Sequence, residues 1–383
     1  MNSPTPETID ERHVAIEGKK LLYFGGCDYL RLSHKAEIRL SAVESLRNEP
    51  SLSSSASRTT TGDRSIYLQL EKQLTALNGT EDSLLTGAGY LANLSLSSYL
   101  SEAADGLLID EKCHPSLRDA AKLSGLPVRN YRHCDVNSAA EISSGLPDNQ
   151  HWFLLSESMF GLDGSIMPLN AFRRMLPVAV SFIIDDAHGF GVLGYNFWNE
   201  GDTSSGDART VIKTLSLAKT VGCHGGAIAG PLKVTNSIRN QGATWAGHTP
   251  FPMHLAHAAI KSIEWLSTKP ELSSQLSHRI DLMSDILSSL GLLKKTGLMS
   301  PVFSFRLGET LTEESIQALK DLVVESGIYP SFIRYPGGLN NLIFRVAISS
   351  SHQKSDLQKL GKTLVQLNQF FGCEQFLLSD QMS

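Results

Sequence analysis

Polar side chains follow several short apolar runs, at the points where strands are expected to end. Asp185 and His188 come at the end of the run VSFIID, and Lys219 lies 34 residues after the aspartate. His114 follows the run GLLIDEKC, and Gly89 follows SLLTGA where a helical pattern begins. In an open α/β sheet, ligands bind beyond the carboxyl ends of the strands. The sequence therefore predicts a carboxylate, two imidazoles, an amine and a helix N-terminus around one ligand.

This set of groups matches what pyridoxal phosphate (PLP) chemistry requires. A lysine amine forms a Schiff base with the aldehyde of the cofactor. A carboxylate keeps the pyridine nitrogen protonated, so that the ring can act as an electron sink. Backbone N–H groups at the start of a helix bind the phosphate, and a flat side chain covers the ring. We therefore expect PLP as the cofactor.

The elements that must position these groups are visible as alternating patterns. Short apolar runs alternate with helical spacing through the middle of the chain, which indicates a mostly parallel α/β sheet. From about Met253 the pattern changes to a long helix, followed by further helical stretches and the strand-like runs PVFSFRLG and LIFRVAIS. We expect an N-terminal segment over residues 1–45, a large PLP-binding α/β domain over 46–266, and a small α+β domain over 267–383.

Composition excludes several classes of protein. The 34 basic and 39 acidic residues give a net charge of −5, which argues against a general nucleic-acid binder. No apolar run reaches the length of about 20 residues that a membrane helix needs, and the first residues lack the features of a signal peptide. The 5 cysteines are scattered and lack CxxC spacing. We therefore expect a cytoplasmic enzyme with no membrane span and no metal site.

The order of the motifs resembles that of the α-oxoamine synthases. These are fold-type-I PLP enzymes that condense an amino acid with an acyl thioester and release CO₂. The stretch IIDDAHGFGVLG (183–194) is similar to the DDAHG segment of the family. Other similar segments follow in the same order along nearly the whole chain: FGGCDYLRLS (24–33), SASRTTTGDRSIYLQLEKQL (55–74), TGAGYLANLSL (86–96), KCHPSLRDA (112–120), YRHCDV (131–136), ESMFGLDGSIMPL (157–169), SLAKTVGCHGG (216–226), HTPFP (248–252) and LIFRVAISSSHQ (342–353).

The resemblance implies the PLP-dependent transferase fold of type I, with a mostly parallel central sheet between helices. It also assigns roles at the reacting end of the cofactor. Lys219 would bind PLP and act as the acid and base at the substrate Cα. Asp185 would pair with the pyridinium nitrogen, His188 would contact the ring hydroxyl, and His114 would stack on the ring.

The resemblance implies further roles at the phosphate and the substrate. The backbone at Gly89 and Tyr90, together with Ser216, would hold the phosphate. Thr249 would reach the phosphate bound by the partner subunit, because these sites lie at the interface of a homodimer. Arg345 would bind the carboxylate of the amino acid, a bidentate contact that suits a guanidinium.

The chain departs from the family pattern at several positions. Cys27 stands where the family usually has an asparagine that touches the substrate carboxylate, which makes it a candidate substrate contact. Gly161 and Ala218 each stand where a serine is usual, Arg31 stands in place of a glycine, and Tyr67 in place of a frequent histidine. These changes leave the cofactor chemistry intact and leave the identity of the substrate open.

The activity implied is the decarboxylative Claisen condensation of a small amino acid with an acyl-CoA or acyl carrier protein thioester. The formation of 8-amino-7-oxononanoate in biotin biosynthesis is the favoured example. Two alternatives stay open, because one fold hosts several activities. One is a different PLP enzyme of the same fold, an aminotransferase or a decarboxylase. The other is a PLP-binding homologue without condensation activity.

Residues 189–194 also match GxGxxG, the pattern of a dinucleotide site. That interpretation requires a helix to begin at the motif. The following residues, YNFWNEGDTSSGD, are rich in turn formers and predict no helix. We therefore do not expect a dinucleotide site.

Overall fold

The computed structural model describes residues 5–147, 149–199, 209–293, 298–307, 312–333, 342–371 and 376–378. Contacts along the chain form two compact units. Unit 1 comprises Met1–His34, Gly161–Ser165 and Pro270–Ser383, and unit 2 comprises Lys35–Phe160 and Ile166–Lys269. The N-terminal segment up to His34 thus clusters with the C-terminal part of the chain. Within the described residues, no helix combines the length and apolar character needed to cross a membrane.

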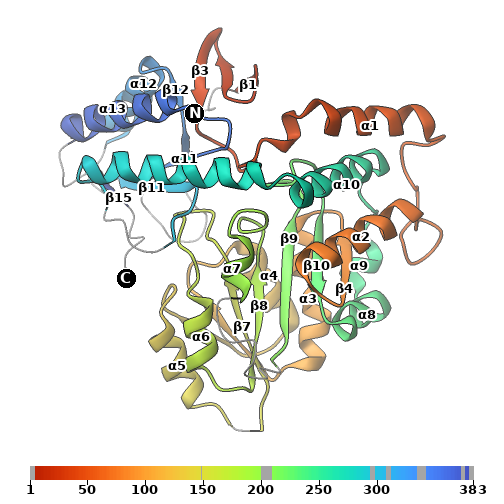
Figure 1. The fold of residues 1–383 in the computed structure, drawn as a ribbon. Helices are drawn as coiled ribbons and strands as arrows, with labels where there is room; N and C mark the ends of the chain where they lie inside the picture. Colours follow the sequence, from red (N-terminus) through yellow and green to blue (C-terminus); the bar gives the residue numbers. More distant parts are fainter. Residues whose placement is uncertain are drawn as a thin grey trace. The chain divides into compact units, whose positions relative to one another are not determined.

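Unit 2 contains a seven-stranded sheet in the order β4-β10-β9-β8-β7-β5-β6. Figure 1 labels the strands β7, β8, β9, β10 and β4, which lie side by side in this order. The strands of this sheet are β4 (Asp82–Thr86), β5 (Gly106–Asp110), β6 (Val128–Tyr131), β7 (Trp152–Glu157), β8 (Val180–Asp185), β9 (Val211–Ser216) and β10 (Gly226–Gly230). The five strands from β6 to β9 pair in parallel, whereas β10 is antiparallel to both of its neighbours. The prediction of a mostly parallel sheet is therefore confirmed.

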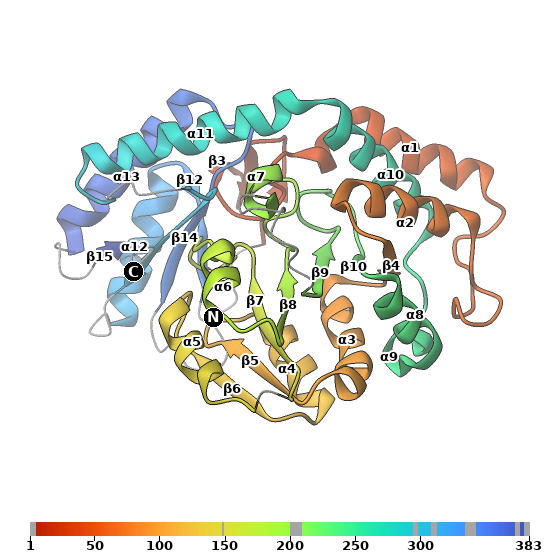
Figure 2. The ribbon, with the colours of Figure 1, turned by 60° about the horizontal axis from the view of Figure 1, so that its bottom comes forward.

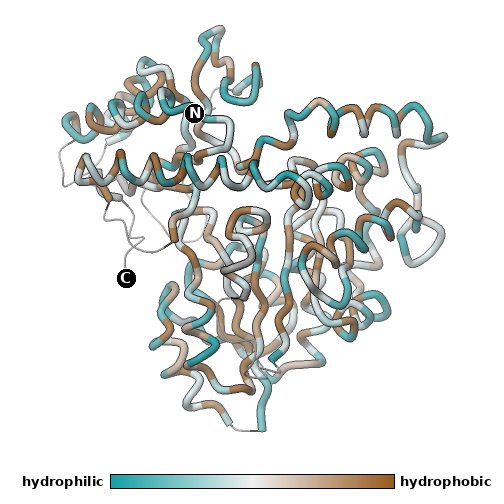
Figure 3. Tube along the Cα trace, viewed as in Figure 1, coloured by the Kyte–Doolittle hydropathy of each residue, from teal (hydrophilic) through white to brown (hydrophobic). Residues whose placement is uncertain are grey.

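Helices cover both faces of this sheet (Figure 2). The helices of unit 2 are α1 (Ala36–Asn48), α2 (Ser65–Asn78), α3 (Gly89–Ala103), α4 (Pro115–Ser124), α5 (Val136–Ser144), α6 (Leu169–Met175), α7 (Gly194–Asn199), α8 (Leu232–Gln241), α9 (Ala243–Gly247) and α10 (Met253–Thr268). Leu84 packs with α3, α4, α8 and α9 in one apolar cluster, while its neighbour Leu85 packs with α2 and α10 in another. Successive strand residues face opposite sides, so both faces of the central strands are buried, and these strands are rich in apolar residues (Figure 3).

The prediction that turns follow Gly194 is wrong for residues 194–199, which form the short helix α7. Phe197 in this helix is buried, and its ring packs edge-on against Trp198. Burial of apolar side chains stabilises short helices that local propensity alone would not form. A Cβ at position 189 would overlap the Ser158 hydroxyl and the Asp186 carboxylate. The first glycine of the GxGxxG match is thus explained by close packing.

Unit 1 contains two small sheets and several helices. One sheet has the order β1-β2-β3-β12 and the other β13-β14-β11-β15. The elements are β1 (Glu7–Thr8), β2 (His13–Ile16), β3 (Lys19–Tyr23), η1 (Leu32–His34), α11 (Pro270–Ser289), β11 (Val302–Leu307), α12 (Glu313–Glu325), β12 (Ile328–Tyr329), β13 (Ser331–Ile333), β14 (Ile343–Ala347), α13 (Lys354–Phe371) and β15 (Phe376–Leu378). The parallel pairing of β12 with β3 joins the N-terminal strands to the C-terminal part of the chain. The predicted boundaries at residues 45 and 266 stay a prediction.

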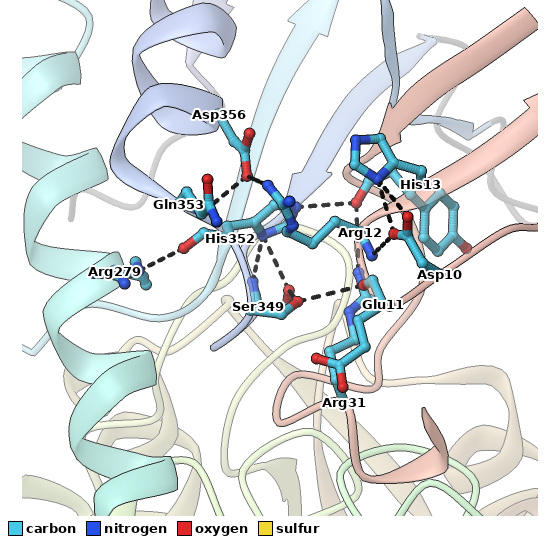
Figure 4. A network of polar contacts seen from close by, with 12 residues as sticks. Asp10, Glu11, Arg12, His13, Arg31, Arg279, Ser349, His352, Gln353 and Asp356 are labelled. Carbon is cyan, nitrogen blue, oxygen red and sulfur yellow. Dashed lines mark hydrogen bonds and ion pairs between the residues drawn. The ribbon is translucent and has the colours of Figure 1, made fainter. Parts of the chain in front are cut away.

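A buried histidine near the start of α13, His352, contacts the N-terminal segment of unit 1 (Figure 4). His352 is fully buried and its ring stacks on Phe24, with ring centroids 4.4 Å apart. The Ser349 N–H donates to Nδ1 at 2.9 Å, so Nε2 carries the proton and donates to the Tyr23 carbonyl at 3.1 Å. Burial lowers the pKa of His352 from 6.5 to about 3. The ring is therefore neutral in the folded protein.

This histidine should make stability fall in mild acid. The unfolded chain takes up a proton on His352 near pH 6.5, whereas the folded chain resists it to about pH 3. The stabilisation is therefore complete above pH 6.5 and is lost as the pH falls, by up to about 1.4 kcal/mol per pH unit. Urea unfolding at pH 7.0 and pH 5.5 should show a drop that is smaller in His352→Gln. The exposed His278 on α11 gives the matched control His278→Gln, which should keep the wild-type drop. An unchanged drop in His352→Gln would contradict the assignment.

Candidate active site at the carboxyl edge of the large sheet

Four polar residues end neighbouring parallel strands of unit 2. Asp110 ends β5, Glu157 ends β7, Asp185 ends β8 and Ser216 ends β9. Because these strands run in the same direction, their last residues lie at one edge of the sheet. The sequence argument placed its candidate groups at this edge.

Asp185 is held by an amide that sequence reasoning missed. Its carboxylate is buried and accepts hydrogen bonds from the Asn93 Nδ2 at 2.7 Å and from the Ala187 N–H at 3.0 Å. Asn93 in turn accepts from the Thr214 hydroxyl at 2.6 Å and donates to Ser116 Oγ at 2.8 Å. Both groups that contact the Asp185 carboxylate are hydrogen-bond donors. They hold the carboxylate in one orientation as an acceptor.

The imidazole of His114 lies at the N-terminus of α4 and belongs to the same network. Its Nδ1 is 2.7 Å from Ser116 Oγ, and its backbone N–H donates to Glu157 Oε1 at 2.8 Å. Burial lowers the pKa of His114, so the neutral ring is favoured near pH 7. The ring of Tyr90 stands edge-on to it, with centroids 6.1 Å apart. A neutral, oriented ring of this kind is suited to stack on a planar cofactor.

Glu157 and Lys219 complete the charges around this edge. Glu157 pairs in register with Asp185, and its pKa is raised well above the usual value by burial and by the charge of Asp185. Two neighbouring carboxyl groups cannot both ionise without cost, so the charge of Asp185 favours the protonated form of Glu157. Lys219 is half-buried in the turn that follows β9. The positive charge of Lys219 lowers the pKa of both Glu157 and His114. The amine therefore lies near both side chains.

The start of α3 provides an anion site beside Ser216. The N-cap residue Ala88 has no side-chain atom that could accept a hydrogen bond. The first N–H groups of the helix therefore lack a side-chain cap. Position 89 must be glycine, because a Cβ there would lie 2.9 Å from Ser216 Cβ. The Ser216 hydroxyl therefore lies beside the helix start, and this arrangement fits a phosphate group. Together with the amine and the buried carboxylate, it fits PLP.

Two further predicted residues, His188 and Thr249, belong to the same unit. His188 is buried in the turn after β8, and Thr249 is exposed. The neighbour of Thr249, His248, contacts the glycine loop directly, because the Gly87 N–H donates to its Nε2 at 3.1 Å. Burial lowers the pKa of His248. The roles predicted for His188 and Thr249 toward the cofactor stay predictions.

Arg345 and Cys27 are brought together in unit 1. Arg345 is buried on β14 and its guanidinium is 3.7 Å from the Cys27 thiol. Within the described part of the chain, Arg345 Nε has no hydrogen-bond partner. This guanidinium therefore keeps capacity for a carboxylate. That it serves the same site as Lys219 stays a prediction.

Sequence signals existed for two of the missed residues. Glu157 ends the apolar run HWFLLSE in the same way that Asp185 ends VSFIID. Asn93 lies one helical turn after Gly89, and residues four apart share a helix face. His248 carries no such signal, because its role depends on how the segment before α10 packs on the glycine loop.

Comparisons with known proteins agree with this geometry. The family model for aminotransferase class I and II matches residues 20–364. A protein of Methanococcus vannielii named "putative 8-amino-7-oxononanoate synthase" is 30% identical over 344 residues, covering 89% of this chain and 90% of the relative. A protein of the same name from Trichormus variabilis is 29% identical over 360 residues, covering 93% and 91%.

Solved structures share the fold. Serine palmitoyltransferase of Sphingomonas wittichii superposes with a TM-score of 0.85 at 20% identity, covering 96% of this chain and 92% of that chain. 8-Amino-7-oxononanoate synthase from Francisella tularensis superposes with a TM-score of 0.74 at 23% identity, covering 91% and 98%. The predicted fold of type I is thus confirmed. The chain belongs to the aminotransferase class I and II family and, within it, to the α-oxoamine synthases, which are PLP-dependent transferases.

Proposed function

We propose that the protein catalyses the decarboxylative Claisen condensation of a small amino acid with an acyl thioester, in the manner of 8-amino-7-oxononanoate synthase. The observation that carries the proposal is the grouping of the Lys219 amine, the buried Asp185 carboxylate and the uncapped start of α3 at one sheet edge. The names of the relatives support the choice of acyl transfer. A cytoplasmic location is part of the same proposal.

The residues would divide the work as follows. PLP, when bound, supplies an electron sink for negative charge at the substrate Cα. The first N–H groups of α3 and the Ser216 hydroxyl hold its phosphate. Asp185, oriented by Asn93, accepts a hydrogen bond from the pyridine nitrogen, and His114 covers the ring. Lys219 removes a proton from Cα and returns one after CO₂ has left.

Arg345 would select for an amino acid by binding its carboxylate. A guanidinium with an unpartnered Nε offers a donor for this contact. Cys27 beside it lacks the amide donor that the family usually has at this position, so the guanidinium carries more of the recognition. This difference bears on which amino acid is accepted.

We also propose a homodimer as the active form. Helix α1 packs on α10, yet Leu40, Val43 and Leu46 on α1 are 40–54% exposed. Leu68 on α2 is 54% exposed as well. The exposed apolar residues Leu40, Val43 and Leu46 recur at helical spacing on one element, which is typical of a protein interface. Light scattering should therefore give twice the mass of the chain.

The activity is tested by measuring free thiol and CO₂ with glycine, L-alanine or L-serine against a series of acyl-CoA thioesters. The 8-amino-7-oxononanoate reaction requires alanine and a seven-carbon dicarboxylic acyl group, so we expect that pair to react fastest. Formation of a 2-oxo acid without thiol release would instead identify an aminotransferase. A bound cofactor with no product from any pair would identify a homologue that has lost condensation.

A further inference from the structure

A thiol, an imidazole and a carboxylate meet at the end of the large sheet that carries β6. His133 and Cys134 follow β6, and Asp110 ends the neighbouring strand β5. His133 Nδ1 is 2.9 Å from Asp110 Oδ1, and the Cys134 Sγ is 3.8 Å from His133 Nε2. The imidazole therefore lies between the carboxylate and the thiol. Asp110 ends a strand at the same sheet edge as the candidate active site, but the proposed condensation assigns no role to any of these three side chains.

Asp110 fixes the orientation of the other two residues. It is fully buried, and its Oδ2 accepts a hydrogen bond from the Cys134 backbone N–H at 2.8 Å. Its Oδ1 accepts from the Lys112 N–H at 2.8 Å and lies within hydrogen-bond distance of His133 Nδ1. A carboxylate on Nδ1 selects the tautomer with the proton on that nitrogen. The lone pair of Nε2 then faces the thiol.

The imidazole ring is held from another side as well. Phe160 is buried and stands edge-on to the His133 ring, with centroids 4.4 Å apart. Cys134 itself is half-buried. The thiol thus lies beside a base that is held in a fixed position.

We propose that Cys134 is a nucleophilic thiol, with His133 as its base and Asp110 as the group that orients the base, and that it exchanges with low-molecular-weight disulfides. A nucleophile within reach of a base that a third group orients is the arrangement that activates side-chain nucleophiles. The thiolate is the reactive form in disulfide exchange. The family motif that this segment resembles has asparagine in place of Cys134.

The exchange needs no reactant other than the Cys134 thiol and the disulfide. His133 Nε2 takes the proton of the Cys134 thiol, and the thiolate attacks one sulfur of the disulfide. A new S–S bond forms at Cys134 as the bond in the reagent breaks. The leaving thiolate receives the proton from His133 and departs as a free thiol. Cys134 is oxidised, and half of the reagent is reduced.

A metal site explains the same three residues less well. Their donor atoms lie within 4.8 Å of one another, but a structural zinc site takes four ligands. Both oxygens of Asp110 already accept backbone hydrogen bonds, from Lys112 and Cys134. The carboxylate is therefore committed to the two loops that it joins.

The test is the rate at which glutathione disulfide modifies each cysteine of the full-length, PLP-loaded protein at pH 7. Mass spectrometry of the peptides locates the adduct. Cys223 is also half-buried and serves as the internal reference. We expect Cys134 to react at least tenfold faster than Cys223 in the wild type. His133→Gln should lower the rate at Cys134 at least tenfold and leave the rate at Cys223 unchanged.

A rate at Cys134 no greater than at Cys223 in the wild type would overturn the proposal. So would an unchanged rate in His133→Gln with an intact cofactor absorbance. Because the first comparison uses only the wild type, the proposal stays testable even if the variant fails to fold. Cys134→Ser should remove the adduct from this peptide, and alkylation by iodoacetamide should rank the cysteines in the same order. None of these readouts depends on the condensation activity.

Discussion

Replacement of Lys219 with alanine is expected to lower kcat/KM by at least about 10⁴-fold, because the variant loses both the amine that binds the cofactor and the base at Cα. Lys219 is half-buried in the turn after β9, and its charge acts on Glu157 and His114. No other lysine is expected to take its place, so the loss should be close to complete. The measurement is thiol release from the acyl thioester under single-turnover and steady-state conditions.

The control for this variant is Lys233→Ala, which removes an exposed amine from α8. It should keep wild-type activity and the visible absorption of the bound cofactor. Lys219→Ala should lose the visible absorption band, while its far-UV circular dichroism, which reports the backbone, stays the same. Activity of Lys219→Ala within tenfold of the wild type would show that another group holds the cofactor.

The sequence predicts the sheet because its central strands are buried on both faces. Runs such as VSFIID and HWFLLSE are apolar throughout, which separates them from helices with one apolar face. The antiparallel strand β10 has no separate signal, because GAIAG is as apolar and small as a parallel strand. The short helix α7 is missed since it depends on burial of Phe197 rather than on local propensity.

The candidate site was predictable to a different extent at each position. Asp185 and Ser216 end apolar runs, and a parallel sheet brings such ends to one edge. The sequence does not predict the contact of Asn93 with Asp185, because the two residues lie 92 positions apart. The raised pKa of Glu157 depends on burial and on a charged neighbour, and both arise only from the packing.

Replacement of Asp185 with asparagine is expected to lower kcat by about 10²–10⁴-fold. Removal of one partner from a buried ion pair costs about 3–5 kcal/mol, and each 1.36 kcal/mol is a factor of about ten in rate. The asparagine keeps the size of the side chain but loses the charge that would hold the proton on the pyridine nitrogen. Its NH₂ group also competes with the donor from Asn93, which now points at Asp185 Oδ2. The kcat under saturating substrates measures the loss.

The neighbouring residue gives a matched control with the same substitution. Asp186 is also buried and accepts a hydrogen bond from the Ser158 hydroxyl at 2.5 Å. Burial raises the pKa of Asp186 to about 7, so the carboxyl is already partly neutral at neutral pH and an amide mimics that form. Asp186→Asn should therefore change kcat by less than about fivefold, since no charge at the cofactor is lost. Equal losses in the two variants would assign the effect to the fold of the turn, whereas a loss confined to Asp185→Asn assigns it to the charge at the ring nitrogen.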